Sequence, residues 1–238
     1  MNLDDLRSGE ECLGDLGVCL ALGRNQGDAP LARSQRVDAG ALNLSAIQHT
    51  PAVSGRLHPA AVAKTSEQAR TARNLVDRTA ALFPWIQRVG ITVTVRLPTR
   101  IRTLLYRDAH RRVFAWFNRR DWELNTLAMD PDRFTITSGD PQRWQLPGPG
   151  DTYRGVDGFL ELQDAWMEVW GDLRLDLDDV VDAGHGRVVV LFRESGTAAA
   201  SGVALEEPIA MINEFAGGRL VRQTYWRDKE AALHSVGL

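Results

Sequence analysis

Two ionisable side chains lie in apolar stretches of the sequence, where burial can tune acid or base chemistry. His110 falls on the apolar side of a helical repeat over residues 108–117. Glu207, Met211 and Asn213 are separated by even numbers of residues along a predicted strand, so their side chains point to the same face. Either group could act as a general acid or base inside an apolar pocket. The alternatives are a core histidine with satisfied hydrogen bonds and a solvated carboxylate at a strand start.

Motifs of other common chemistries are missing from the sequence. It has no phosphate-binding glycine loop, no G-x-S-x-G, no His-x-x-x-His and no zinc-ligand spacing. Cys12 and Cys19 stand without a further cysteine or a nearby histidine, which indicates ordinary thiols. We therefore expect neither a metal nor a cofactor.

The overall charge narrows the range of partners. The formal net charge is −3 and the isoelectric point is near 6.0, so no global positive field attracts phosphate groups. Nucleic acid and membrane are therefore not expected as partners. No run of about 18 apolar residues occurs, and the opening "MNLDDLRSGEE" is acidic where a signal peptide is basic. A cytoplasmic location is expected.

Residues 1–105 are rich in Ala, Gly and Arg and keep no apolar period for long. We expect a poorly structured N-terminal extension, with a mis-called start as a further possibility. Two local elements stand out in it. Thr65 and Gln68 match a capping box ahead of a helix that would end at Pro84, and "ITVTV" at 91–95 would form a short strand.

Apolar residues recur at regular helical or strand spacing only after residue 105. Helical repeats cover 108–117 and 155–170, with a short helix across 121–129 and a strand at 132–137 between them. The loop "SGDPQRWQLPGPGD" is either a lid or a surface loop. After Gly171 every second residue tends to be apolar, as in a β-strand. Predicted strands then alternate with turns, and a final helix follows. This order predicts an α+β fold with a curved antiparallel sheet wrapped around three helices, a cone-shaped α+β barrel.

Several stretches in this order resemble the SnoaL-like branch of the nuclear transport factor 2-like superfamily, which includes the ketosteroid isomerases. The resemblance covers residues 106–238. It is carried by "VFAWFNRRDWE", "MDPD", "YRGVDGF", "EVWGDLRLDLDDVVDAGHGRVVVLFRESG" and "GGRLVRQTYWRDKEAALHSVGL".

The resemblance implies a cone with an apolar pocket between sheet and helices, in a homodimer that binds a small apolar organic ligand. Polar pocket residues would either position that ligand by hydrogen bonds or serve only packing. The residues expected to line the pocket are Val113, Phe117, Thr137, Tyr153, Trp166, Met211, Asn213, Gln223 and Tyr225.

The known isomerase machinery is not carried over. The family's catalytic Tyr, its Asp base and its protonated Asp align with Val113, Thr137 and Met211, none of which transfers a proton at neutral pH. Two functions remain open. One is a cofactor-free isomerase, cyclase or hydrolase that uses Glu207 or His110 as acid or base. The other is a non-catalytic ligand-binding or dimerising module.

Overall fold

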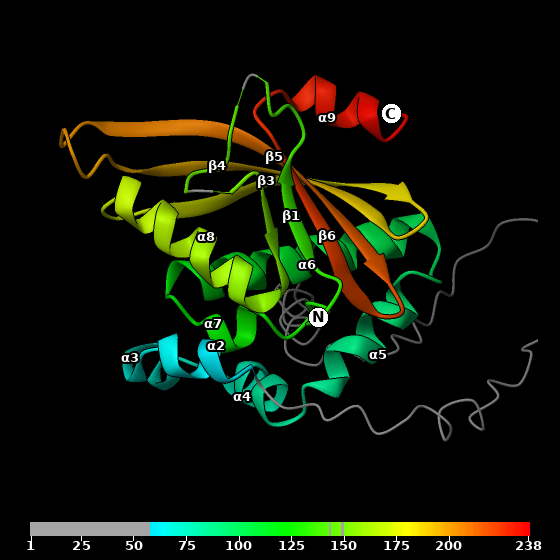
Figure 1. The fold of residues 1–238 in the computed structure, drawn as a ribbon. Helices are drawn as coiled ribbons and strands as arrows, with labels where there is room; N and C mark the ends of the chain where they lie inside the picture. The colour runs from blue at the N-terminus through cyan, green and yellow to red at the C-terminus, as the bar shows by residue number, and fades with distance from the viewer. Residues whose placement is uncertain (1–57, 143, 149) are drawn as a thin grey trace, which may run out of the picture. The chain divides into compact units, whose positions relative to one another are not determined.

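The computed structural model describes residues 58–142, 144–148 and 150–238, so residues 1–57 of the expected extension lie outside the described residues. Six strands form one curved, unclosed sheet in the order β2-β1-β6-β5-β4-β3 (Figure 1). Every strand pair is antiparallel except β1 with β6, which run parallel. The strands are β1 (Thr135–Ser138), β2 (Thr152–Arg154), β3 (Arg174–Gly184), β4 (Arg187–Thr197), β5 (Ala204–Ala216) and β6 (Arg219–Trp226). The predicted α+β class is confirmed, with a mixed sheet instead of a purely antiparallel one.

Two tight turns set the strand register. Gly217 and Gly218 connect β5 to β6 with φ angles of 59° and 73°. His185 and Gly186 connect β3 to β4 with φ angles of 52° and 75°. Positive φ at both central residues matches the right-handed twist of the flanking strands, and glycine adopts it without steric cost. The "AGHG" and Gly217-Gly218 turns are therefore formed as the sequence predicts.

Helices cover both faces of the sheet. On the concave face lie α6 (Thr99–Asn118), α7 (Trp122–Asn125) and α8 (Gly155–Val169), while α9 (Lys229–Ser235) lies on the other side (Figure 1). Alternate residues of β4 point to opposite faces of the sheet. Val188, Val190 and Phe192 belong to the main core, and Val189 and Leu191 pack with the residues of α9. The continuous apolar run in β4 reflects this burial on both faces.

Four more helices precede α6: α2 (Pro59–Lys64), α3 (Glu67–Thr71), α4 (Leu75–Leu82) and α5 (Trp85–Thr94). The single helix predicted from the Thr65 capping box is instead two helices, capped by the side chains of Ser66 and Asn74. The strand predicted at 91–95 is wrong, because these residues belong to α5 and its C-cap. β-branched residues favour strands only where a neighbouring strand can pair with them.

Buried ion pairs and hydrogen bonds join this upstream segment to the end of α6 and to α7. The Arg73 guanidinium donates to Asp121 at 2.6 and 2.8 Å and to Glu123 at 2.7 Å. Asp77 of α4 accepts from the Trp116 indole at 2.7 Å and from Arg119 at 2.6 Å. Residues 58–105, assigned to the extension from sequence, are thus helical and share buried charges with α6 and α7.

Candidate functional site

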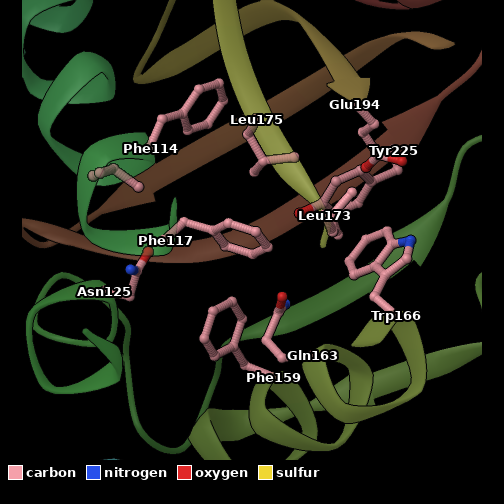
Figure 2. Close-up of a pocket in the computed structure, with 11 residues that line it drawn as sticks. Phe114, Phe117, Asn125, Phe159, Gln163, Trp166, Leu173, Leu175, Glu194 and Tyr225 are labelled. Atoms are coloured by element: carbon pink, nitrogen blue, oxygen red, sulfur yellow. The ribbon is translucent and has the colours of Figure 1, made fainter. Parts of the chain in front are cut away.

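A small cavity lies between α6, α8 and the concave face of the sheet (Figure 2). Its volume is about 30 Å³, enough for one or two water molecules. A ligand larger than water therefore needs the walls to move. The lining residues are Val113, Phe114 and Phe117 of α6, Asn125 of α7, Phe159, Gln163 and Trp166 of α8, Leu173 and Leu175 at β3, Glu194 of β4 and Tyr225 of β6.

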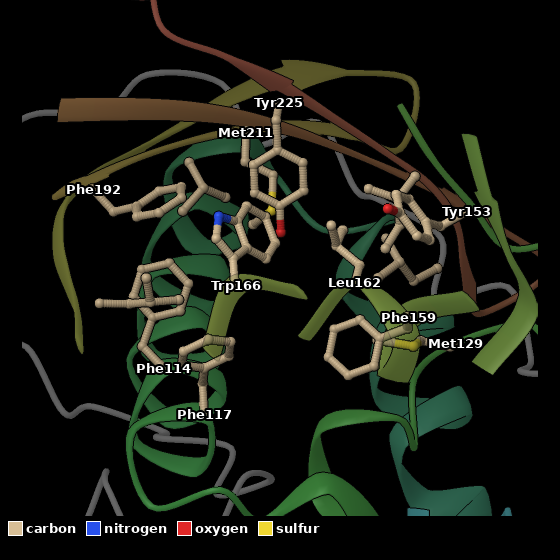
Figure 3. Close-up of a cluster of buried hydrophobic side chains, with 14 of the residues drawn as sticks. Phe114, Phe117, Met129, Tyr153, Phe159, Leu162, Trp166, Phe192, Met211 and Tyr225 are labelled. Atoms are coloured by element: carbon tan, nitrogen blue, oxygen red, sulfur yellow. The ribbon is translucent and has the colours of Figure 1, made fainter. Parts of the chain in front are cut away.

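Five of the eleven residues that line the cavity are aromatic, and several of their rings pack edge to face on a neighbouring ring (Figure 3). Trp166 packs on Tyr225 with ring centroids 5.3 Å apart, and Phe114 packs on Phe192 at 5.1 Å. Trp122 stands behind the wall against Phe117 at 5.5 Å. Such contacts add to the hydrophobic stabilisation of each ring, so the wall is both apolar and ordered.

Glu194 places a carboxyl group in this apolar wall. It lies on β4 between its strand partners Leu175 and Glu207, and only 4% of its surface is exposed. The pKa of Glu194 is raised to about 8, mainly by burial and also by the nearby charge of Glu207, while Arg227 acts in the opposite direction. Glu194 is therefore mostly protonated at neutral pH and can exchange its proton there.

Two further polar groups accompany Glu194. Tyr225 lines the cavity together with Glu194 (Figure 2), and burial together with the charge of Glu194 raises the Tyr225 pKa, which keeps the phenol neutral. Gln163 is fully buried and points into the cavity, and neither atom of its amide has a hydrogen-bond partner among the described residues. An unpaired buried amide is costly, so Gln163 is available to a ligand or a water molecule.

Glu207, expected as the acid or base, stands beside the cavity but not in its wall. It faces the same side of the sheet as Glu194, its direct partner across β4 and β5. Its side chain is 31% exposed and pairs with Arg227 at 3.1 Å. Arg227 in turn lies over the Trp144 ring at 5.3 Å. Glu207 is thus a partly exposed, ion-paired residue next to the buried Glu194.

His110, the other expected acid or base, is held by two hydrogen bonds in the core. Its Nδ1 lies 2.7 Å from the Tyr106 carbonyl and its Nε2 lies 2.9 Å from the Asn213 amide nitrogen. These partners fit a neutral ring that donates from Nδ1 and accepts at Nε2. Burial lowers the pKa of His110 to about 4. Because both nitrogens are occupied and the ring does not line the cavity, we assign His110 to the core.

The expected pocket residues separate into three groups. Val113, Phe117, Trp166 and Tyr225 line the cavity. Met211, Asn213 and Gln223 are buried on the concave side of β5 and β6, away from it. The other two lie elsewhere: Tyr153 is buried and donates from its hydroxyl to the Pro147 carbonyl at 2.6 Å, and Thr137 pairs with Thr224.

Thr137 misses the cavity because of its strand parity. Its neighbour Ile136 is fully buried and pairs with the inward-facing Gln223, so Thr137 faces the opposite side of the sheet. Sequence reasoning also passed over Glu194 and Gln163. A signal for each was present: Glu194 shares the alternation of Val188, Val190 and Phe192, and Gln163 lies on the apolar stripe of α8.

No group of three His, Cys, Asp or Glu side chains among the described residues could hold a metal ion. No helix in the described part of the chain is both long and apolar enough to cross a membrane.

Comparisons with known proteins find likeness only at the level of fold. No protein-family model and no curated protein matches the chain. An NTF2-like protein from Burkholderia pseudomallei is 23% identical over 56% of this chain and 97% of its own, with a TM-score of 0.44. A protein titled a SnoaL-like polyketide cyclase, from Jannaschia sp. CCS1, is 18% identical over 59% of this chain and 95% of its own, also at 0.44. TerC, crystallised with polyporic acid, is 23% identical over 54% and 95%, at 0.43.

A protein with a ketosteroid isomerase-like fold from Catenulispora acidiphila, in complex with trimethylamine, is 11% identical over 48% of this chain and 81% of its own, with a TM-score of 0.37. These similar structures are described as NTF2-like, SnoaL-like and ketosteroid isomerase-like, and the likeness concerns the fold alone.

Proposed function

We propose that this SnoaL-like domain binds a small, largely apolar organic molecule in the cavity and transfers a proton with Glu194, without a cofactor. The observation that carries the proposal is the buried Glu194 carboxyl in a wall of aromatic and aliphatic side chains. A carboxyl group whose pKa is near 8 populates both protonation states near neutral pH, as general acid and base catalysis requires.

The neighbouring groups suit chemistry at a carbon next to a carbonyl. The Glu194 carboxylate takes a proton from that carbon, and the carboxyl group returns it to another atom of the same molecule, as in an isomerase or cyclase step. Negative charge that develops on the substrate oxygen would be met by the neutral Tyr225 hydroxyl and the Gln163 amide. Glu194 thus replaces Glu207 and His110 as the candidate acid and base.

The small cavity favours a second candidate function. A volume of about 30 Å³ does not admit an organic ligand unless the rings move. If they stay closed, the domain is a non-catalytic module that acts by dimerisation, and Glu194 is a structural residue.

A ligand panel distinguishes the two functions. Lipophilic ketones, including unsaturated ones whose double bond can migrate, are screened for thermal stabilisation and for turnover. The wild-type protein is compared with Glu194→Gln and with Glu206→Gln, a control in which an exposed carboxylate on the neighbouring strand is neutralised. We expect ligands to stabilise all three proteins and only Glu194→Gln to lose turnover. No stabilisation by any ligand supports the second function, and unchanged turnover in Glu194→Gln excludes Glu194 as the base.

A further inference from the structure

Helix α5 turns its apolar side away from the rest of the domain. Trp85, Ile86, Val89 and Val93 fall within an arc of about 100° on the helix, and they are 56, 36, 46 and 52% exposed. No residue of α5 is buried. A surface helix normally directs its apolar stripe at the core, so the outward stripe of α5 needs a partner of its own.

A different side of α5 packs against the β5–β6 turn, and this contact keeps the apolar side of the helix exposed. Gly218, in the turn between β5 and β6, lies against Thr92 and the Arg88 carbonyl of α5. In the ribbon view α5 lies beside that turn (Figure 1). The apolar surface also continues along the chain on either side of α5. Leu82 and Phe83 before it are 73 and 48% exposed, and Leu104 in the first turns of α6 is 65% exposed.

The same part of the chain is strongly basic. Residues 78–107 contain six arginines and neither Asp nor Glu, although the whole chain has a net charge of −3. Arg102 and Arg107 pair with Asp182 and Asp179 of β3. The remaining four form no ion pair within the part of the chain that the structure describes; they are Arg78, Arg88, Arg96 and Arg100. The local surface is therefore both apolar and cationic.

We propose that α5 and these four arginines dock on an anionic lipid surface. An amphipathic helix with a Trp-containing apolar side and flanking arginines lies in the headgroup region, where apolar burial and attraction to negative lipids add together. A second copy of the same surface would bring like charges together, which disfavours self-association as the occupant. This inference is independent of the chemistry of Glu194 and revises the expectation, drawn from overall charge, that a membrane is not a partner.

Flotation of the full chain with vesicles tests the proposal. The vesicles contain phosphatidylcholine alone or phosphatidylcholine mixed with phosphatidylglycerol. One variant combines Trp85→Ser with Val89→Ser, and another combines Arg96→Gln with Arg100→Gln. The matched control combines Val203→Ser with Leu205→Ser, which are 53 and 48% exposed on another part of the surface.

The wild type and the control should float with the mixed vesicles only, and salt should weaken the binding. The Trp85→Ser, Val89→Ser variant and the Arg96→Gln, Arg100→Gln variant should each lose binding by on the order of tenfold while keeping the wild-type melting temperature. Absence of wild-type binding, equal binding to neutral vesicles, or an equal loss in the control overturns the proposal. It is also overturned if light scattering shows a dimer that only Trp85→Ser with Val89→Ser dissociates, because the surface is then an interface between copies.

Discussion

Glu194 and Glu207 lie directly opposite each other on β4 and β5, with both side chains on the concave side of the sheet. Their surroundings differ. Glu207 is half-exposed and paired with Arg227, whereas Glu194 is buried among apolar residues and has its pKa raised to about 8. The charge of Glu207 thus acts on a buried carboxyl group that can take up or release a proton near neutral pH.

The pH dependence of stability should show Glu194 and His110 acting in opposite directions. The Glu194 pKa rises from 4.5 to about 8 on folding, so its contribution to stability is present below pH 4.5 and is lost as the pH rises to 8. The His110 pKa falls from 6.5 to about 4, so stability is lost as the pH falls from 6.5 to 4. The two slopes oppose each other between pH 4.5 and 6.5, and only the Glu194 slope remains from 6.5 to 8.

Chemical denaturation across this pH range measures the effect. The free energy of unfolding should decline from pH 6.5 to 8, and Glu194→Gln should flatten that decline. The full Glu194 contribution has an upper bound of roughly 5 kcal/mol. If the free energy of unfolding declines equally in Glu194→Gln, another ionisable group causes the pH dependence.

Asn213→Leu should destabilise the protein without changing proton-transfer chemistry. The substitution leaves the buried Nε2 of His110 without its donor, at a cost of about 1–3 kcal/mol. Urea denaturation measures this loss, and turnover of any substrate found in the ketone panel should remain at the wild-type rate per folded molecule. A selective loss of turnover would return His110 to the active site.

Gln163→Leu should separate ligand binding from stability. The buried Gln163 amide makes no hydrogen bond to a described residue, so an apolar side chain of similar size should keep or slightly raise the melting temperature. Ligand affinity should fall by on the order of tenfold, because one polar contact is removed. Affinity measured by calorimetry should instead be unchanged if the amide only fills space.

Arg73→Met should show that the helices before residue 106 belong to the folded unit. The Arg73 side chain is 8% exposed and pairs with Asp121 and Glu123, whose carboxylates would remain buried without it. Breaking such a network costs about 3–5 kcal/mol. The matched control is Arg78→Met on the exposed side of α4, which should change unfolding by less than about 0.5 kcal/mol. Equal effects of the two substitutions would argue that the Arg73 pairs contribute little.

Part of the fold and of the site can be predicted from the spacing of apolar residues in the sequence. The alternation in β5 and β6 places Met211, Asn213, Gln223 and Tyr225 on one face, and the structure has all four on the concave side. Paired glycines fix the β5–β6 turn because few other residues adopt its φ angles.

Other features needed tertiary information. Val188 to Phe192 of β4 are all apolar and are buried on alternating faces, so only the tertiary structure shows which of these faces, the one that Glu194 shares, contains the cavity. Thr137 lies in a strand of four residues, where an alignment shifted by one position exchanges the two faces. Arg73 meets Asp121 across 48 residues of sequence, and no local pattern predicts such a contact.

The ionisation of Glu194 is the most direct test of the proposed site. Carboxyl carbon NMR with Glu-labelled protein, assigned by loss of one signal in Glu194→Gln, gives its titration curve. The predicted midpoint is about pH 8 in the wild type. Glu207→Gln should lower the midpoint and Arg227→Gln should raise it, because these substitutions remove a like charge and an opposite charge. A wild-type midpoint near the ordinary 4.5 of a glutamate would contradict the assignment of Glu194 as the acid and base.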